Sequence, residues 1–422
     1  MPRDNNRLVK SVEEIRSHFP ALERVHNGHR VAYFDGPGGT QVPRLVVDAM
    51  NDYLLNHNAN THWSYPSSNE TDAIIEKSRA TIGEFLNAAP DEIVFGQNMT
   101  SITFHLSRAL GRQFEPGDEI VVTELDHHAN SDTWRALAQD RELRIRVLPF
   151  DTETGQLELD KLDGLINKRT KLIAIGAASN ILGTVNPIKK IAKIARDAGA
   201  LSFVDAVHYA AHQLIDVREL GCDFLAVSAY KFYGPHIGIL YGRGELLKKV
   251  NVPKLRPAPD YTPERLETGT QNHEGIAGAA AAVDFLASLA NNGTRRERLE
   301  STFDQFHARH DELFRFMWTE LAAVAGVRLF GPTPDHPRTS TLSFTVEGMD
   351  SSEVAARLAV KGLFLSDGDF YALTVVERLG VGRLLRAGLA CYTTKAEVER
   401  LIEALRSIAR GREPGFSVVS PL

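Results

Sequence analysis

Cysteine is scarce in this chain of 422 residues, which contains only Cys222 and Cys391. Two cysteines cannot build a disulfide framework, and so small a number suits a reducing compartment. An apolar signal-peptide core is absent from the polar first residues, 1–19. The most apolar long stretch, Ile276 to Ala290, is too short to span a bilayer and contains Asp284. These absences predict a cytoplasmic protein without a membrane span.

An excess of positive charge is also missing. The 48 lysines and arginines are outnumbered by 54 acidic residues, which gives a net charge of −6. No basic run occurs, so we expect neither a nucleic-acid partner nor an anionic membrane partner. Apolar residues make up 43% of the chain and charged residues 24%, which is the composition of a globular protein with a full core.

Apolar runs and helical periods alternate in the first two thirds of the chain. The expected strands are 92–95, 119–123, 144–149, 171–176, 201–205, 224–228 and 238–241. The expected helices between them are 100–110, 131–140 and 187–198. This alternation predicts an α/β fold with a mostly parallel seven-stranded sheet and helices on both faces.

The pattern changes after Ile276, where helices become longer and strands fewer. The expected elements are helices 276–290, 296–324, 351–361 and 395–409 and strands 327–330, 341–346 and 384–389. We therefore expect a smaller α+β unit, with a boundary near Asn292. The predicted organisation is an N-terminal segment, 1–30, that packs on the small domain, a large domain, 31–291, and a small C-terminal domain, 292–422.

Polar residues follow several of the predicted strands, and ligands on such sheets bind beyond the carboxyl ends of the strands. Asp205 ends one strand and Ser228 ends another, while Lys231 comes directly after Tyr230. A buried lysine has a lowered pKa and can form a Schiff base with an aldehyde. A carboxylate at a neighbouring strand end can hold a pyridinium nitrogen protonated. The stretch 228–235 therefore predicts a lysine that carries pyridoxal phosphate (PLP).

Several motifs in order extend this prediction, namely those around His127, Asn180, Asp205, Lys231 and Arg386. Over nearly its whole length, the chain resembles the class V aminotransferase family of fold-type I PLP enzymes. Within the family it most resembles the branch of cysteine desulfurases and selenocysteine lyases. The resemblance implies PLP as the cofactor, a large domain with a mostly parallel sheet, and a smaller α+β C-terminal domain.

The resemblance gives three residues a place around the cofactor ring. Lys231 matches the Schiff-base lysine, Asp205 the aspartate on the pyridine nitrogen, and His127 the histidine that stacks on the ring. His128 is the alternative for the stacking role. We expect no metal site at the two histidines, because adjacent residues seldom face one ion and no third ligand has suitable spacing.

Phosphate binding is the next implied role. Thr100 and Ser101 stand where a helix N-terminus offers free N–H groups and a favourable dipole. Thr100 alternatively serves as a plain N-cap. Ser228 matches a second phosphate-binding hydroxyl. Thr270 matches the residue that reaches the phosphate from the other subunit, which implies a homodimer with shared active sites.

Two further residues are matched to the substrate, an amino acid. Asn180 matches an asparagine near the substrate and the ring oxygen. Arg386 matches the arginine that holds the α-carboxylate, a role that suits its bidentate guanidinium. A structural ion pair is the alternative for Arg386.

The loop 366–372 departs from the desulfurase pattern. Tyr371 occupies the position of the cysteine that accepts sulfur, so it is expected beside the substrate. Cys222 and Cys391 are expected to be small buried residues that do not replace this thiol. Ser366 stands where an arginine is usual. We expect Asp367 and Asp369 to be solvated, and the alternative is that they receive a cation.

The surroundings of the lysine depart as well. Tyr230 replaces the usual histidine before the lysine, and His208 stands where glutamine is usual. The pair resembles that of kynureninases, in which the tyrosine contacts the phosphate. We therefore count both residues among the cofactor contacts.

The expected reaction begins with removal of the Cα proton, with Lys231 as the base. β-Elimination from a cysteine-like substrate is preferred, because the most similar branch acts on sulfur amino acids. Epimerisation, as in the isopenicillin N epimerase-like relatives, and transamination share the same carbanion and stay open. A PLP-binding protein without catalysis is a further alternative.

Overall fold

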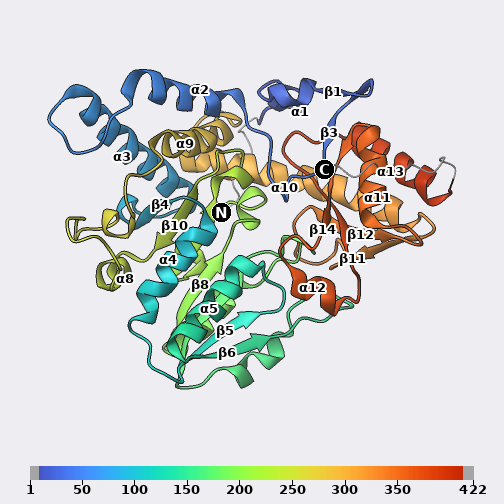
Figure 1. Cartoon of the computed structure of the whole chain (residues 1–422). Coiled ribbons are helices and arrows are strands. Elements are labelled where there is room, and N and C mark those ends of the chain that lie inside the picture. Colours follow the sequence, from blue (N-terminus) through green and yellow to red (C-terminus); the bar gives the residue numbers. More distant parts are fainter. Residues whose placement is uncertain (1–8, 412–422) are drawn as a thin grey trace, which may run out of the picture.

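A seven-stranded sheet forms the centre of the larger part of the molecule (Figure 1). The computed structural model describes residues 9–411, so the ends of the predicted terminal segments, 1–8 and 412–422, lie outside the described residues. The strands are β4 (Ile93–Gly96), β5 (Glu119–Thr123), β6 (Arg144–Leu148), β7 (Thr170–Gly176), β8 (Leu201–Asp205), β9 (Phe224–Ser228) and β10 (Gly238–Gly242). Their order is β4-β10-β9-β8-β7-β5-β6. Only β10 runs antiparallel to its neighbours, so the predicted sheet is confirmed.

The strands of this sheet are apolar on both faces because helices cover both faces. In β9, Leu225 and Val227 belong to one core cluster, whereas Phe224 and Ala226 belong to the other. The helices on the first side are α3 (Pro66–Leu86), α6 (Ile188–Asp197) and α9 (His273–Ser288). Those on the second side are α4 (Met99–Gly111) and α5 (Asp132–Arg141). Continuous apolar runs are typical of such doubly covered parallel strands.

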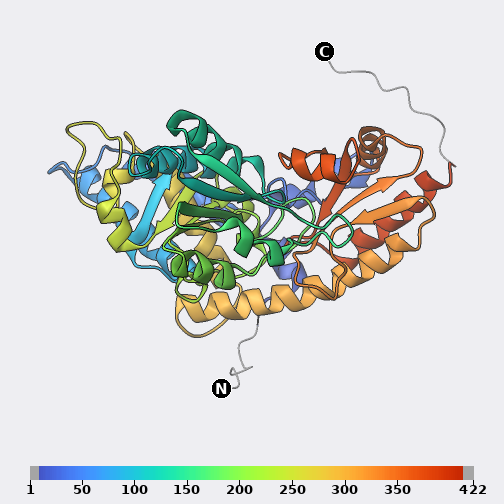
Figure 2. The same ribbon diagram turned by 90° about the horizontal axis from the view of Figure 1, so that it is seen from below.

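A four-stranded sheet forms the smaller part and carries its own core. The strands, in spatial order, are β11 (Val327–Phe330), β12 (Thr341–Val346), β15 (Leu384–Gly388) and β14 (Ser366–Gly368), and all pairs are antiparallel. Its main helices are α11 (Ser351–Val360) and α13 (Lys395–Ala409). The long helix α10 (Arg295–Ala322) runs along one side of the molecule from the large part to the small part (Figure 2). The predicted domain boundary near Asn292 stays a prediction.

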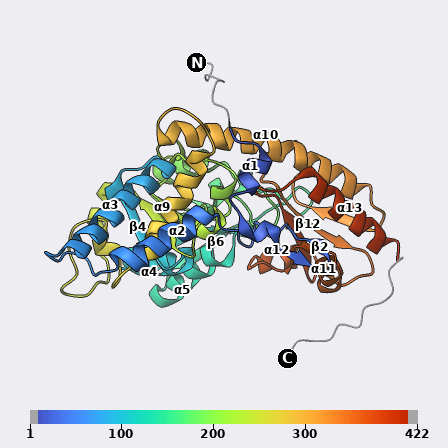
Figure 3. The same ribbon diagram turned by 90° about the horizontal axis from the view of Figure 1, so that it is seen from above.

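The N-terminal elements lie along the large part, at the junction of the two parts and along the smaller part (Figure 3). They are α1 (Val12–Arg16), η1 (Pro20–Glu23), β1 (Val25–His26), β2 (His29–Arg30), β3 (Ala32–Tyr33), α2 (Arg44–Asp52) and the π-helical turn η2 (Tyr53–His57). Ser11 caps α1 in a capping box with Glu14, as its position before the apolar residues predicts. β3 pairs in parallel with β13 (Leu363–Phe364), which joins the start of the chain to the smaller part.

Short elements account for most of what sequence periodicity misses. The remaining α-helices are α7 (Val217–Leu220), α8 (Gly244–Lys249) and α12 (Leu373–Arg378). The remaining 3-10 turns are η3 (Pro90–Glu92), η4 (His128–Asn130), η5 (Leu159–Lys161), η6 (Asp163–Leu165), η7 (Tyr209–Ala211), η8 (Ala229–Lys231) and η9 (Glu264–Leu266). A search of residues 9–411 finds no helix that is long and apolar enough to cross a membrane.

Candidate active site

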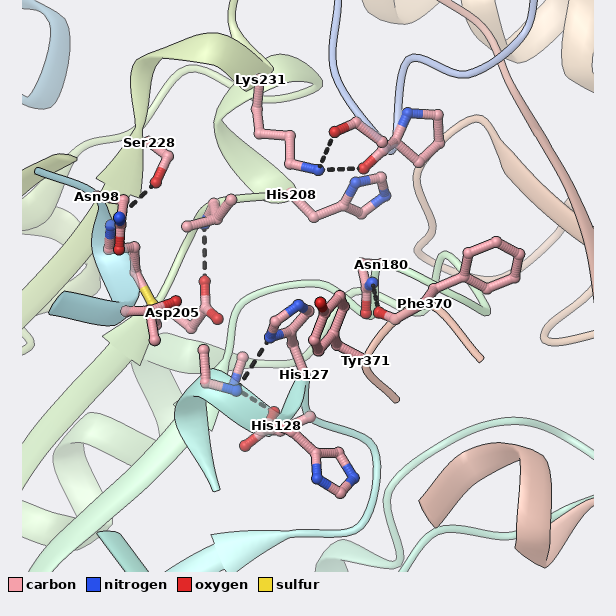
Figure 4. Close-up of a pocket in the computed structure, with 18 of the residues that line it drawn as sticks. Asn98, His127, His128, Asn180, Asp205, His208, Ser228, Lys231, Phe370 and Tyr371 are labelled. Atoms are coloured by element: carbon pink, nitrogen blue, oxygen red, sulfur yellow. Dashed lines mark hydrogen bonds between the residues drawn. The ribbon is translucent and has the colours of Figure 1, made fainter. Parts of the chain in front are cut away.

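An open cavity of about 1280 Å³ lies at the carboxyl ends of the strands of the large sheet (Figure 4). It brings together every sequence-predicted site residue except one. The residues that line it are Thr100, Ser101, His127, Asn180, Asp205, His208, Ser228, Tyr230, Lys231, Tyr371 and Arg386. The exception, Thr270, is exposed and lies outside this cavity. Its predicted partner is the phosphate of a second subunit.

Lys231 ends the 3-10 turn that follows β9, so the sheet places its side chain at the cavity. Its ammonium group donates hydrogen bonds to the backbone carbonyls of Pro37 and of Gly38, the latter at 2.9 Å. Burial, followed by the positive charge of Arg386, lowers the pKa of Lys231 to about 7. A substantial fraction of this amine is therefore neutral near pH 7 and can act as a nucleophile or base.

Asp205 is the last residue of β8 and is nearly fully buried. Its Oδ1 accepts a hydrogen bond from the Val207 N–H at 2.9 Å, and burial raises its pKa to about 6. A buried carboxylate gains stability from a facing cation, because the cation compensates for lost hydration. Asp205 can therefore hold a protonated pyridine nitrogen, as predicted for it.

A second buried carboxyl group, that of Asp126, adjoins Asp205. Asp126 Oδ1 accepts a hydrogen bond from the N–H of Gly176 at 2.7 Å, and Gly176 is the register partner of Asp205. Asp126 Oδ2 accepts another from Asn130 Nδ2 at 3.1 Å. Burial, and then the charge of Asp205, raises the pKa of Asp126 to about 8. One of the two neighbouring carboxyls thus stays neutral at pH 7, as expected for close like charges.

His127 follows Asp126 and lies in the cavity. Its Nδ1 accepts a hydrogen bond from the Ala129 N–H at 3.0 Å, and burial, then Lys231, lowers its pKa to about 4. The neutral ring therefore carries its proton on Nε2. His128 lies 2.7 Å from Asp132 instead, with Nδ1 against the carboxylate. The stacking role of His127 stays a prediction.

The N-terminus of α4 opens into the same cavity. Its N-cap is Asn98, whose Oδ1 accepts a hydrogen bond from the Ser101 N–H at 2.9 Å. The alternative that Thr100 caps the helix is therefore wrong. Ser228 Oγ accepts from the Met99 N–H at 3.1 Å, which fixes the helix start to the end of β9. The N–H groups of Met99 and Ser101 already have acceptors, so this first turn offers a phosphate the Thr100 N–H and the helix dipole.

Arg386 projects from β15 and brings the smaller part of the molecule into the cavity. One terminal nitrogen donates to the backbone carbonyl of Asn180 at 3.1 Å. The other donates to Ser366 Oγ at 3.2 Å and to Asp35 Oδ1 at 3.4 Å. The side chain is buried and its pKa falls to about 10 through burial, so it stays charged at neutral pH.

His208 and Tyr230 differ in how they face the cavity. His208 Nε2 lies 3.0 Å from Thr339 Oγ1 and 3.1 Å from Thr341 Oγ1, so this nitrogen is engaged by the smaller part. Tyr230 stacks on His236 with ring centroids 4.9 Å apart. Its ring also lies 4.9 Å from the Lys231 nitrogen. The predicted phosphate contact of Tyr230 stays a prediction.

The expectation of solvated acidic residues in the loop 366–372 is wrong for Asp367, whereas Asp369 is exposed, as expected. Asp367 forms an ion pair with Arg383, with 2.7 Å between Oδ2 and the guanidinium. Asp369 Oδ1 accepts from the Tyr371 N–H at 2.8 Å and so closes a turn. Short polar side chains favour such local turns, and no periodic pattern reveals them.

Both cysteines are buried, as expected, and neither lines the cavity. Burial raises the pKa of each thiol to about 12, so each stays a neutral thiol. Among residues 9–411, no group of three or more histidine, cysteine or acidic side chains could hold a metal ion.

The cavity suits PLP on an observation independent of the motifs. Of the six buried side-chain atoms that lack a hydrogen-bond partner among the described residues, two line the cavity: Asn180 Oδ1 and Arg386 Nε. Buried polar atoms normally have partners, so these two atoms indicate a polar ligand beside them. The cavity also offers the α4 N-terminus for the phosphate, Asp205 for the ring nitrogen and Lys231 for the aldehyde. The residues present therefore fit PLP.

Sequence reasoning missed three contributors to this site. Asp35 touches Arg386, the carbonyls of Pro37 and Gly38 hold Lys231, and Asp126 lies beside Asp205. The glycine-rich run 36–39 was a usable signal, because a Cβ on Gly38 would fall 2.4 Å from the Asp35 carboxylate. No periodic signal points to Asp126.

Comparisons with known proteins agree with this geometry. Residues 32–401 match the family model described as Aminotransferase class-V. A cysteine desulfurase of Dickeya dadantii is 34% identical over 415 residues, which cover 94% of this chain and 97% of that protein. A cysteine desulfurase of Pectobacterium carotovorum is 33% identical over 415 residues, 94% of this chain and 98% of that protein.

Solved structures show the same fold. The apo cysteine desulfurase of Thermococcus onnurineus superposes with a TM-score of 0.87 and 29% identity, over 96% of this chain and 99% of the other. The cysteine desulfurase CsdA of Escherichia coli gives 0.84 and 28%, over 96% and 100%. With the family match, these likenesses show that the chain belongs to the class V aminotransferase family and is a PLP-dependent enzyme.

Proposed function

We propose that this enzyme is a C–S lyase, which eliminates the sulfur substituent from Cβ of a cysteine-like amino acid. The relatives are named cysteine desulfurases, which supports a sulfur amino acid as the substrate. The observation that carries the proposal is the absence of a thiol from the residues that line the cavity. Tyr371 stands where the sulfur-accepting cysteine is expected, and both cysteines of the chain are buried elsewhere. Sulfur then leaves as free sulfide.

The substrate α-carboxylate binds to Arg386. This guanidinium is buried, and its Nε has no hydrogen-bond partner among the described residues. A carboxylate placed there makes charge-assisted bonds in a site of low dielectric constant. Asn180 Oδ1, which also lacks a partner in the described part of the chain, is the acceptor for a substrate or cofactor proton.

Lys231 removes the Cα proton with its neutral amine. Its pKa of about 7 places it near the pH at which a general base is most effective. When bound, PLP supplies an electron sink for the negative charge left at Cα. Asp205 keeps the ring nitrogen protonated, and His127 lies against the ring.

The leaving sulfur takes the bonding electron pair as the Cβ–S bond breaks. Lys231 is an ammonium after it has taken the Cα proton, and it can give that proton to this thiolate. The elimination product then takes up water, so cysteine and water yield pyruvate, ammonia and hydrogen sulfide. No oxidant or sulfur acceptor is needed for this balance.

We also propose that the active enzyme is a homodimer. Large apolar side chains are exposed on and near α2 and η2: Leu55 is 82% exposed, Trp63 60% and Tyr261 57%. A monomer rarely exposes such a group together, so the group favours a second protein surface. Thr270 is exposed near Tyr261 in the chain, where the family resemblance calls for a contact with the other subunit. Light scattering should give twice the mass of one chain, and Leu55→Asp should lower it.

A product assay with L-cysteine tests the proposed reaction. The holoenzyme in deuterated water should release pyruvate, ammonia and sulfide in equal amounts, without a thiol acceptor. Lys231→Ala with added PLP is the control for the free cofactor. Alanine with protein persulfide, D-cysteine without sulfide, or a keto acid that retains its sulfur would each overturn the lyase in favour of desulfuration, epimerisation or transamination. No Cα exchange with any amino acid would favour a non-catalytic protein.

A further inference from the structure

Two adjacent aromatic residues, Phe370 and Tyr371, stand at the point where the smaller part meets the cavity. Both have a positive φ of 56°, a conformation that side-chain-bearing residues rarely adopt. Such residues persist where surrounding contacts determine the backbone, and they cluster at functional sites. We call residues 369–372 the aromatic loop. Its unusual backbone indicates that contacts with other segments determine its conformation.

Hydrogen bonds fasten the aromatic loop to the large part of the molecule and to itself; within the loop, the Ala372 N–H donates to the Asp369 carbonyl at 2.8 Å. The His128 N–H donates to the Tyr371 carbonyl at 2.7 Å. Asn180 Nδ2 donates to the Phe370 carbonyl at 2.9 Å. The Tyr371 N–H donates to Asp369 Oδ1 at 2.8 Å. The loop backbone is thus tied to the segments that carry the predicted stacking histidine and the predicted substrate asparagine.

The two rings of the aromatic loop each lie against one functional side chain, and Figure 4 shows the Tyr371 ring beside His127. The guanidinium carbon of Arg386 lies 4.0 Å from the centre of the Phe370 ring. The Tyr371 ring stacks on His127, with centroids 5.4 Å apart and planes 25° apart. Tyr371 is 73% exposed, so burial of its own surface does not explain this position.

We propose that Phe370 and Tyr371 are positioning residues, one for the carboxylate-binding Arg386 and one for the cofactor-stacking His127. The Phe370 ring holds the guanidinium plane by a cation–π contact, while Nε, which has no partner among the described residues, stays available to a carboxylate. The Tyr371 ring supports one face of the imidazole, so the other face can lie flat on the cofactor ring. In desulfurases the corresponding loop carries the cysteine that accepts sulfur. In this chain the loop instead positions Arg386 and His127 with the rings of Phe370 and Tyr371.

This inference depends on the predicted roles of His127 and Arg386, and it does not depend on which reaction follows. It rests on the proposed function and extends it, because it gives Phe370 and Tyr371 positioning roles in the same cavity. Its tests therefore measure binding and spectra rather than products. A negative lyase assay would overturn the proposed reaction, whereas normal binding and spectra in the loop variants would overturn the proposed roles of Phe370 and Tyr371.

For Tyr371, the test compares Tyr371→Ala with Tyr371→Phe. The alanine variant should bind PLP about tenfold more weakly and should lose intensity in the circular dichroism of the visible cofactor band. The phenylalanine variant keeps the ring and should behave like the wild type. Equal behaviour of both variants, whether both are normal or both impaired, would overturn the stacking role.

For Phe370, the test compares Phe370→Ala with Phe370→Leu by titration of the cofactor band with L-alanine and with ethylamine. Phe370→Ala should weaken binding of L-alanine about tenfold and leave that of ethylamine and PLP unchanged, because only L-alanine has a carboxylate. Phe370→Leu should show the same loss, since leucine fills the space without a π face. Unchanged L-alanine binding in Phe370→Ala, or no response of the wild type to L-alanine, would overturn the proposal for Arg386.

A third measurement covers variants that fold poorly. Amide hydrogen exchange of the apoenzyme reports the bond from the His128 N–H to the loop, and this amide should exchange faster in Tyr371→Ala than in Tyr371→Phe. Equal protection would show that the ring does not stabilise the contact and would count against the proposal.

Discussion

The strand ends of the large sheet and the loop 366–372 build the same cavity by different means. At the strand ends, Asp205 and Ser228 are the last residues of β8 and β9, and Lys231 follows three residues later. Each side chain is placed by hydrogen bonds between neighbouring strands. Residues 369–372 of the loop have no such frame: Phe370 is held by Asn180, a residue 190 positions away in the chain.

This difference separates two kinds of functional residue. A parallel sheet collects the ends of its strands at one edge, so a polar residue after a buried strand is placed by the strand itself. A loop residue takes its place from contacts with distant segments, and its own sequence says little about them. Changes at the strand ends should therefore affect the chemistry most, while changes in the loop should affect binding.

The largest effect is expected for Lys231→Ala. Loss of the amine removes the base and the covalent link to PLP, so the rate should fall by about 10⁴-fold or more. The visible band of the lysine-bound cofactor should vanish in an absorption spectrum taken after gel filtration. Lys231→Arg keeps the charge without a titratable amine and should fail equally. Retention of the band in either variant would show that Lys231 is not the lysine that binds PLP.

A second strong effect is expected for Asp205→Asn, with Asp126→Asn as its matched control. If Asp205 faces the ring nitrogen as proposed, loss of this carboxylate costs about 3 kcal/mol, which is about a 100-fold loss of kcat/KM. The pKa of Asp126, raised to about 8, keeps this carboxyl mostly neutral at pH 7, so its neutral amide should change kcat/KM by less than about threefold. Steady-state kinetics at pH 7 compares the two. A larger loss of kcat/KM in Asp126→Asn than in Asp205→Asn would indicate that Asp126, and not Asp205, faces the ring nitrogen.

The same division explains what the sequence could predict. The seven strands and the long helices α10 and α13 follow from apolar runs and helical periods, and the structure places them within a few residues of the predicted bounds. The strand-end residues follow from these elements. Arg386 lies in a predicted strand too, although only the family resemblance gave it a role.

The remaining features depend on contacts between distant segments. Asp35 reaches Arg386 across 351 positions, and Asp126 becomes a neutral acid only because β7 and β8 lie beside it. The strand β14 and the helix α12 are too short for a period, so 366–372 reads as an open loop. Burial and pairing, rather than residue type, then decide that Asp367 is not solvated.

A tenfold change with pH is expected for the rate of PLP uptake, because Lys231 titrates near neutral pH. In the proposed role of Lys231, only its neutral amine attacks PLP, and burial with the Arg386 charge places its pKa at about 7. The rate at which the apoenzyme takes up PLP should therefore rise about tenfold from pH 6 to pH 8. Asp35 raises this pKa, so Asp35→Asn should move the midpoint to lower pH. Stopped-flow absorbance measures both, and a midpoint near 10 would contradict the buried position of the amine.

The smallest effect is expected from the loop ion pair, in Asp367→Asn. Arg383 is about half exposed, and exposed pairs contribute at most about 1 kcal/mol, because water and salt screen them. The KM for an amino acid should rise by no more than about fivefold, and added salt should reduce the difference. Asp369→Asn is the control, since its amide oxygen can still accept from the Tyr371 N–H. A change in kcat larger than that in KM would place the loop among the chemical groups, and the distinction between strand ends and loop would fail.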